Sequence, residues 1–145
     1  MTNLPFQLTL DAADPQALGR FWALALGYVE EPPPEGFDDW EAALDAWGVP
    51  SQNRNDAYAI VDPERARPRV FLQRVPEPKT AKNRLHIDID SGARRAEGDK
   101  DWAILRAEAA QLVAAGATAV QEFDLPAQGQ WIVMNDPEGN EFCVC

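Results

Sequence analysis

The chain has 145 residues and a formal net charge of −11, with 24 acidic against 13 basic residues. A field of this sign repels phosphate backbones and anionic lipid surfaces, so neither nucleic acid nor a membrane is an expected partner. No stretch approaches the ~20 apolar residues of a membrane span, and we find no secretory signal at the N-terminus. The two cysteines, Cys143 and Cys145, are too close in sequence for an unstrained disulfide. We therefore expect a single-domain protein in a reducing, cytoplasmic setting.

The first part of the chain predicts a strand, a helix and three further strands. Apolar and polar residues alternate over residues 4–11, which predicts a strand with Gln7 on its polar face. Asp14 and Pro15 mark the start of a helix, as an N-cap and a proline at the first helical position, and Gly27 marks its end. The further strands are predicted at residues 28–31, 58–61 and 69–75.

Residues 32–55 interrupt this pattern and are interpreted as an insertion folded over the domain. Three consecutive prolines at its start exclude a helix or a central strand there. A short helix is predicted at residues 37–47, with Trp40 and Trp47 on it. These tryptophans either fix the insertion to the domain, which we favour, or form a lid over a pocket.

The stretch at residues 84–90 reads Arg-Leu-His-Ile-Asp-Ile-Asp and alternates strictly. Such alternation predicts a half-buried strand with its apolar residues on one face. The polar face carries His86, which is the only histidine, together with Asp88. We expect this face to line a cleft.

The second half of the chain repeats the order of the first. A helix is predicted from about Asp101 to Ala115, and Gly116 ends it as Gly27 ends the first helix. The repetition predicts two similar modules whose helices cover one side of a curved sheet and leave the other side concave and partly polar. Strands are predicted at residues 117–123, 129–135 and 140–145.

Several motifs together resemble the vicinal oxygen chelate superfamily, which includes glyoxalase I, extradiol dioxygenases and bleomycin-resistance proteins, and are closest to its glyoxalase-like branch. The resemblance implies an α+β fold in which paired βαβββ modules form a curved, barrel-like mixed sheet around a cleft, with helices on the outer face and often a homodimer. Module one would span about residues 1–76, including the insertion at 32–55, and module two about residues 84–145. The matching segments are Asp14–Gly27, Leu85–Asp88, Gly116–Ala117 and Trp131–Cys145.

Metal sites of this superfamily draw one ligand from each of four strands, usually His, Gln or Glu. By the resemblance, Gln7 and His86 occupy two of these positions. Cys143 stands at a third position, where active metalloenzymes of the family carry Glu. The remaining position is Leu72, or Gln73 after a one-residue shift. Because this set offers one good nitrogen ligand and weak oxygens, we do not expect the full family metal set.

The preferred hypothesis is therefore a glyoxalase-like protein that binds a small organic molecule in the sheet cleft without the full family metal-ligand set. No cofactor is certain, and a divalent metal is possible. A buried, unreactive thiol is the preferred interpretation of Cys143. The face on which Trp131 lies is not settled by the sequence. The expected cleft residues are Gln7, Gln73, Asp88, Trp131 and Cys143.

Three alternatives stay open, and the choice between enzyme and binder is not made. One is a divalent-metal-dependent lyase, isomerase or dioxygenase with Gln7 and His86 as ligands and Glu141 or Cys143 as the third. Another is a metal-free acid/base catalyst that uses His86 and Glu141. Burial of Glu141 beside Trp131 would raise the pKa of its carboxyl group. The last is a scaffold whose cleft is filled by side chains.

Overall fold

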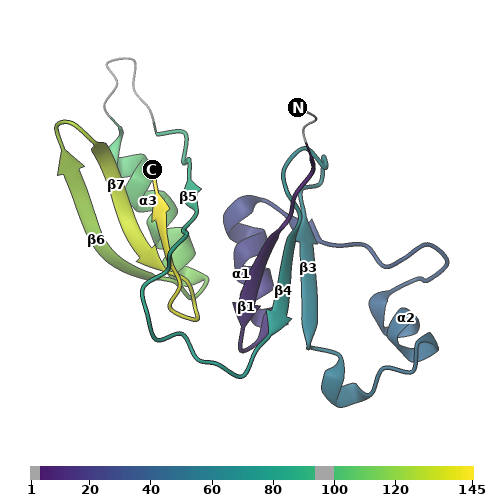
Figure 1. Ribbon diagram of the computed structural model, residues 1–145. Helices are drawn as coiled ribbons and strands as arrows, with labels where there is room; N and C mark the ends of the chain where they lie inside the picture. Colours follow the sequence, from purple (N-terminus) through teal and green to yellow (C-terminus); the bar gives the residue numbers. More distant parts are fainter. Residues whose placement is uncertain (1–3, 94–99) are drawn as a thin grey trace. The chain divides into compact units, whose positions relative to one another are not determined.

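The computed structural model describes residues 4–93 and 100–145. The chain divides into two compact units, Met1–Pro78 and Lys79–Cys145, and each contains one four-stranded sheet (Figure 1). Within the described residues, every helix is too short or too polar to cross a membrane. Each unit therefore has a core and a sheet of its own.

The sheet of the first unit has the strand order β1-β4-β3-β2, with β1 parallel to β4 and the other pairs antiparallel. The insertion follows β2 and contains a short helix and a 3-10 turn. In chain order the elements are β1 Leu8–Ala12, α1 Pro15–Leu26, β2 Val29–Glu30, α2 Trp40–Ala46, η1 Ser51–Asn53, β3 Ala57–Val61 and β4 Val70–Arg74.

Helix α1 covers one face of this sheet, and its ends follow the sequence signals. Asp14 Oδ1 accepts a hydrogen bond from the backbone N–H of Ala17 at 3.1 Å, and Gly27 adopts the left-handed conformation with φ +65°. Gly19 lets the helix approach the sheet closely, because a Cβ there would lie 2.2 Å from Cδ1 of Tyr58. The buried core of the unit is Leu18, Phe21, Trp22, Ile60, Val70 and Leu72.

The sheet of the second unit has the order β5-β8-β7-β6, with β5 parallel to β8. Helix α3 covers one face and brings Leu105 and Leu112 into the core, against side chains that alternate along β7 and β8. The elements are β5 Asp88–Ile89, α3 Trp102–Ala114, β6 Thr118–Leu125, β7 Gly129–Asn135 and β8 Glu141–Val144.

A buried aspartate followed by proline organises a turn in each unit. Asp62 Oδ2 accepts hydrogen bonds from the backbone N–H groups of Ala66 and Arg67 at 3.1 and 3.0 Å. Asp136 Oδ1 accepts from the N–H groups of Glu138 and Asn140 at 3.0 and 2.9 Å. These bonds satisfy backbone donors in the turns that connect the last two strands of each unit.

The predicted α+β class and the repeated βαβββ order are confirmed, although the strands form two separate sheets. Two predicted strands are shorter than expected. The strand predicted at residues 4–11 begins only at Leu8, because pairing with β4 starts where the Leu8 N–H donates to Arg69 O. The strand predicted at 84–90 is reduced to Asp88–Ile89, and the expected apolar residue Leu85 is 68% exposed.

Candidate functional site

Each sheet has one face under a helix and an opposite face, which we call its helix-free face. In the second unit Phe142 and Val144 are fully buried on the α3 side, so Cys143 between them points to the helix-free face. Asp88 is the register partner of Cys143 across the parallel β5–β8 pair and therefore shares this face. His86 precedes Asp88 by two residues and has the same strand parity.

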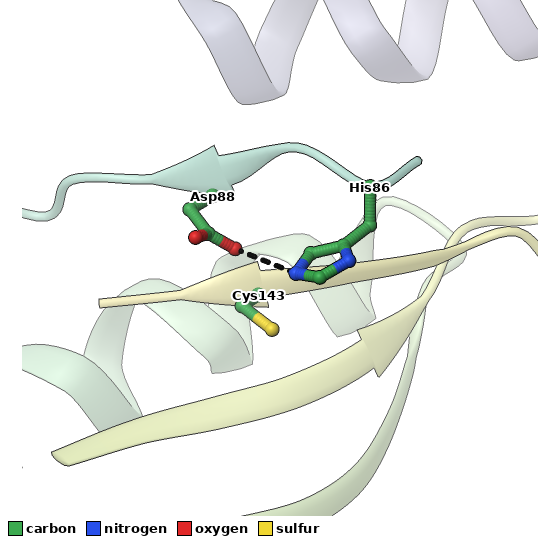
Figure 2. A group of neighbouring side chains, drawn as sticks. All are labelled: His86, Asp88 and Cys143. Atoms are coloured by element: carbon green, nitrogen blue, oxygen red, sulfur yellow. Dashed lines mark ion pairs between the residues drawn. The ribbon is translucent and has the colours of Figure 1, made fainter. Parts of the chain in front are cut away.

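These three residues form a cluster (Figure 2). The ligand atoms of His86, Asp88 and Cys143 all lie within 4.8 Å of one another, and His86 Nε2 lies 3.2 Å from Asp88 Oδ1. The imidazole and the carboxylate are 44% and 59% exposed, whereas Cys143 is buried. The cluster thus combines a buried sulfur with two groups that solvent reaches.

The thiol of Cys143 is unreactive as a free nucleophile in this setting. Burial raises its pKa to about 11, and the negative charge of Asp88 acts in the same direction. A thiol with this pKa is almost fully protonated at neutral pH. This agrees with the interpretation of Cys143 as a buried thiol.

Glu141 lies on the same face but is held by other partners. Its carboxylate accepts a hydrogen bond from the Asn83 backbone N–H at 2.9 Å and pairs with Lys79 Nζ at 3.2 Å. The hydrogen bond from Asn83 is the main cause that lowers the pKa of Glu141 to about 2. The raised pKa expected from its position near Trp131 is therefore wrong, because backbone donors and a cation stabilise the anion.

The register of β7 settles the orientation of Trp131. Val133 pairs with Cys143, so Trp131, two residues earlier, shares the helix-free face. Its ring stacks on Phe123 with centroids 5.0 Å apart and an interplanar angle of 13°. On the same face, Asn135 Oδ1 is buried and has no hydrogen-bond partner among the described residues. The second helix-free face thus carries an aromatic pair beside polar groups.

In the first unit, Gln7 and Gln73 lie on the helix-free side but have partners. Gln7 Oε1 accepts a hydrogen bond from Arg69 at 3.0 Å, and Gln73 Nε2 donates to Asp11 Oδ1 at 2.9 Å. Leu72, the alternative to Gln73 in the family alignment, is fully buried on the α1 side. Of the two residues that the resemblance offers at this position, Gln73 is therefore the one whose side chain is accessible to a ligand.

The insertion forms one wall of an open hollow of about 770 Å³ beside β3, which we call the insertion hollow. Trp40 anchors the insertion by donating its ring N–H to Glu31 O at 2.6 Å, while Trp47 is 54% exposed. Arg54 ties helix α2 to the following loop by ion pairs with Glu41 and Asp45. The uncharged lining includes Trp40, Leu44, Trp47, Ala57, Tyr58, Ala59 and Phe71.

Comparison with known proteins now identifies the family. Residues 7–145 match the glyoxalase-like domain family. The chain belongs to this family. The match covers nearly all of this glyoxalase-like domain and confirms the resemblance to the vicinal oxygen chelate superfamily. No curated protein matches the chain.

Solved structures share the fold of this glyoxalase-like domain at low identity. A glyoxalase/bleomycin resistance protein/dioxygenase family enzyme from Burkholderia phytofirmans PsJN is 14% identical over 95% of this chain and 94% of that chain, with a TM-score of 0.60. The bleomycin-binding protein of Streptomyces verticillus, complexed with copper(II)-bleomycin, is 16% identical over 99% and 96%, with a TM-score of 0.52. The fosfomycin resistance protein FosX of Listeria monocytogenes, complexed with Mn(II) and 1S,2S-dihydroxypropylphosphonic acid, is 12% identical over 99% and 90%, with a TM-score of 0.60.

The donor set of this glyoxalase-like domain does not suit the hard cations that prefer oxygen ligands. Cys143 stands where the family resemblance implies a glutamate, and Glu141 is outside the cluster formed by His86, Asp88 and Cys143. Sulfur and imidazole donors instead suit borderline ions such as Zn²⁺.

Sequence reasoning placed Asp88 in the cleft but did not consider it as a metal ligand. The signal was present, because His86 and Asp88 are two residues apart on an alternating stretch and must share a face. The pair formed by Arg69 and Glu31, with Nε to Oε1 at 2.8 Å, was also missed. These residues lie 38 positions apart, and no local pattern links them.

Proposed function

We propose that this glyoxalase-like domain binds a small organic cation that carries an aromatic ring, in the insertion hollow and without the four-ligand family metal set. The volume of the hollow, about 770 Å³, carries the proposal. Sites for drug-sized ligands are typically clefts of about 300–1,000 Å³ with apolar walls and a few polar groups.

The walls of the hollow favour a flat ring. Trp47 packs edge-on against both Phe37 and Trp40, with ring centroids 5.9 and 6.3 Å apart. Phe71 contributes a further ring from β4, and the small side chains Ala57 and Ala59 leave space above the sheet. Aromatic walls bind rings by stacking and edge contacts.

The charges of the hollow favour a cation. Six carboxylates and three guanidinium groups line it. Two of the guanidinium groups are already paired, Arg54 with Glu41 and Arg69 with Glu31. The excess of carboxylates and the tryptophan faces both attract positive charge. The carboxylate-bearing residues of the lining are Glu30, Glu31, Asp38, Asp39, Glu41 and Asp56.

The family supports binding of a small molecule, since its structural neighbours include a bleomycin-binding protein. The alternative of acid/base catalysis by His86 and Glu141 gains no support, because the low pKa of about 2 makes Glu141 a weak proton acceptor.

The test compares three ligands of similar shape: an aminoacridine cation, uncharged acridine and an acridine carboxylate. We expect the cation alone to quench tryptophan fluorescence and to raise the melting temperature, because a ligand stabilises the folded state by RT ln(1 + [L]/Kd). Trp47→Ala and Asp38→Asn should each weaken binding roughly tenfold, the loss of about one cation–π contact or one charge.

Trp131→Ala is the matched control, because it removes a tryptophan from the second unit. It should leave the affinity unchanged. Weakening by Trp131→Ala and not by Trp47→Ala would place the ligand on the second helix-free face and overturn the proposal. Equal binding of the cation and the carboxylate would also overturn it.

A further inference from the structure

We propose that His86, Asp88 and Cys143 form a site for a thiolate-accepting divalent ion such as Zn²⁺, built entirely within the second unit. This site differs from the four-strand arrangement that the family resemblance implies. Asp88 lies on β5, His86 lies two residues before it on the segment that leads into β5, and Cys143 lies on the neighbouring strand β8. It rests on the cluster alone and does not depend on the insertion hollow.

The spacing of the donors fits a small ion. Zinc binds sulfur at about 2.3 Å, imidazole nitrogen at about 2.0–2.1 Å and carboxylate oxygen at about 2.0–2.2 Å, so tetrahedral ligands lie roughly 3.3–3.7 Å from one another. His86 Nε2 and Asp88 Oδ1 are already 3.2 Å apart, and the Cys143 sulfur is within 4.8 Å of both. Rotation about side-chain bonds can bring the sulfur the remaining distance toward the other two donors.

The backbone holds the three donors together before any ion binds. The Cys143 N–H donates to Ile87 O at 3.0 Å, between the two ligand positions of the neighbouring strand. The Cys145 N–H donates to Ile89 O at 2.8 Å and extends the same ladder. These bonds fix the register that pairs Asp88 with Cys143, so ligand binding would require little reordering of the main chain.

The charges of the donors match a divalent cation. A thiolate, a carboxylate and a neutral imidazole together carry two negative charges. On binding, the S–H bond of Cys143 breaks, its proton is released to solvent, and the sulfur forms a bond to the metal. Three protein ligands leave a fourth position for water or a ligand group, as in zinc sites that stay open.

The sulfur also sets the selectivity. Mg²⁺ and Ca²⁺ take oxygen ligands, and in a site with one carboxylate, one imidazole and one thiolate only the carboxylate supplies oxygen. These ions should therefore bind weakly. Zn²⁺ and Co²⁺ accept all three donor types. We therefore expect the site to distinguish these two groups of ions strongly.

The experiment titrates Co²⁺ into the full chain after treatment with a chelator and records the visible and near-ultraviolet spectrum. We expect one Co²⁺ per chain, a thiolate-to-cobalt charge-transfer band, and loss of that band on addition of Zn²⁺ but not of Mg²⁺. Cys143→Ser should abolish the band, and Asp88→Asn and His86→Ala should each weaken Co²⁺ binding at least tenfold.

Two control variants separate this site from its alternatives. Cys145→Ser should keep the band, because Cys145 is not part of the cluster. Gln7→Ala should also leave the affinity for Co²⁺ unchanged. If the ion instead bound at a site of the family type, in which Gln7 is a ligand, Gln7→Ala would weaken binding. Circular dichroism melts establish that each variant is folded.

Stoichiometric Co²⁺ binding without a charge-transfer band, or no binding at all, would overturn the proposal, as would loss of affinity in Gln7→Ala. None of these results changes the acridine experiment, since its diagnostic variants, Trp47→Ala and Asp38→Asn, lie in the first unit. The two proposals can therefore fail separately.

Discussion

Asp88 Oδ1 lies 3.2 Å from Nε2 of His86, and the pair stands over the buried sulfur of the adjacent strand. The carboxylate can therefore influence two groups at once. It lies within ion-pair distance of the imidazole, and its charge opposes ionisation of Cys143. Removal of this one charge should be visible in the chemistry of the thiol.

The first prediction concerns alkylation of Cys143 by iodoacetamide. With a pKa of about 11, the thiol reacts slowly at pH 8, since roughly one molecule in a thousand is a thiolate. Asp88→Asn removes a cause of the raised pKa and should increase the alkylation rate several-fold in metal-free protein. The rate is measured by mass spectrometry.

The Cys145→Ser background leaves Cys143 as the only thiol and serves as the reference for this measurement. Burial is the largest cause of the raised pKa, so the rate in Asp88→Asn should still be below that of an unfolded control. A slower rate in Asp88→Asn would contradict the electrostatic account.

The second prediction concerns Glu141 and acid stability. Its pKa is about 2 in the folded protein against 4.5 ordinarily, so it stabilises the second unit above pH 4.5 and loses this contribution as the pH falls towards 2. Glu141→Gln should lower the free energy of unfolding by about 1–2 kcal/mol at pH 7, after allowance for solvent screening. Urea unfolding at pH 7 and pH 3 measures the difference.

The effect of Glu141→Gln should be smaller at pH 3, where protonation in the unfolded chain already removes part of the contribution. Lys79→Met removes the ion pair but keeps the Asn83 hydrogen bond, and should cost less than Glu141→Gln. Equal losses at the two pH values would show that the substitution acts through packing rather than through the charge.

Features that depend on neighbouring residues could be predicted from the sequence, whereas features that depend on pairing between distant segments could not. The ends of α1 were predicted correctly, because Asp14, Pro15 and Gly27 act on the backbone beside them. The face of Trp131 was not predicted, since it depends on pairing with β8. The low pKa of Glu141 depends mainly on the backbone N–H of Asn83, which lies 58 positions earlier, and local burial alone suggested the opposite direction.

The candidate site was partly predictable for the same reason. Alternation along residues 84–90 placed His86 and Asp88 on one face without knowledge of any partner strand. Their distance from Cys143 required the parallel register of β5 and β8. A pocket under the insertion was only the less favoured of two interpretations of its tryptophans, because its volume and lining depend on how the loop returns to β3.

The third prediction concerns Gly19 in α1. Alanine in a helix interior normally stabilises relative to glycine by about 1 kcal/mol. At this position the new Cβ would lie 2.2 Å from Tyr58 Cδ1, so Gly19→Ala should destabilise by about 1–3 kcal/mol instead. Thermal melts compare Gly19→Ala in the native and Tyr58→Ala backgrounds. The cost should shrink in the second background, and an increased melting temperature of the single variant would contradict the close approach.

The last prediction concerns the anchoring of the insertion. The Trp40 ring N–H donates to Glu31 O, and Trp40→Phe removes this donor while it keeps an aromatic ring. Loss of one hydrogen bond costs about 1 kcal/mol, so limited proteolysis within residues 32–55 should become roughly fivefold faster.

Trp47→Phe is the matched control, because Trp47 is 54% exposed and its ring contributes edge contacts to the same aromatic cluster. It should change proteolysis little while it weakens binding of the aminoacridine cation. The two tryptophans then have separate roles, with Trp40 holding the insertion and Trp47 forming the wall of the hollow. Faster proteolysis in Trp47→Phe than in Trp40→Phe would reverse this assignment.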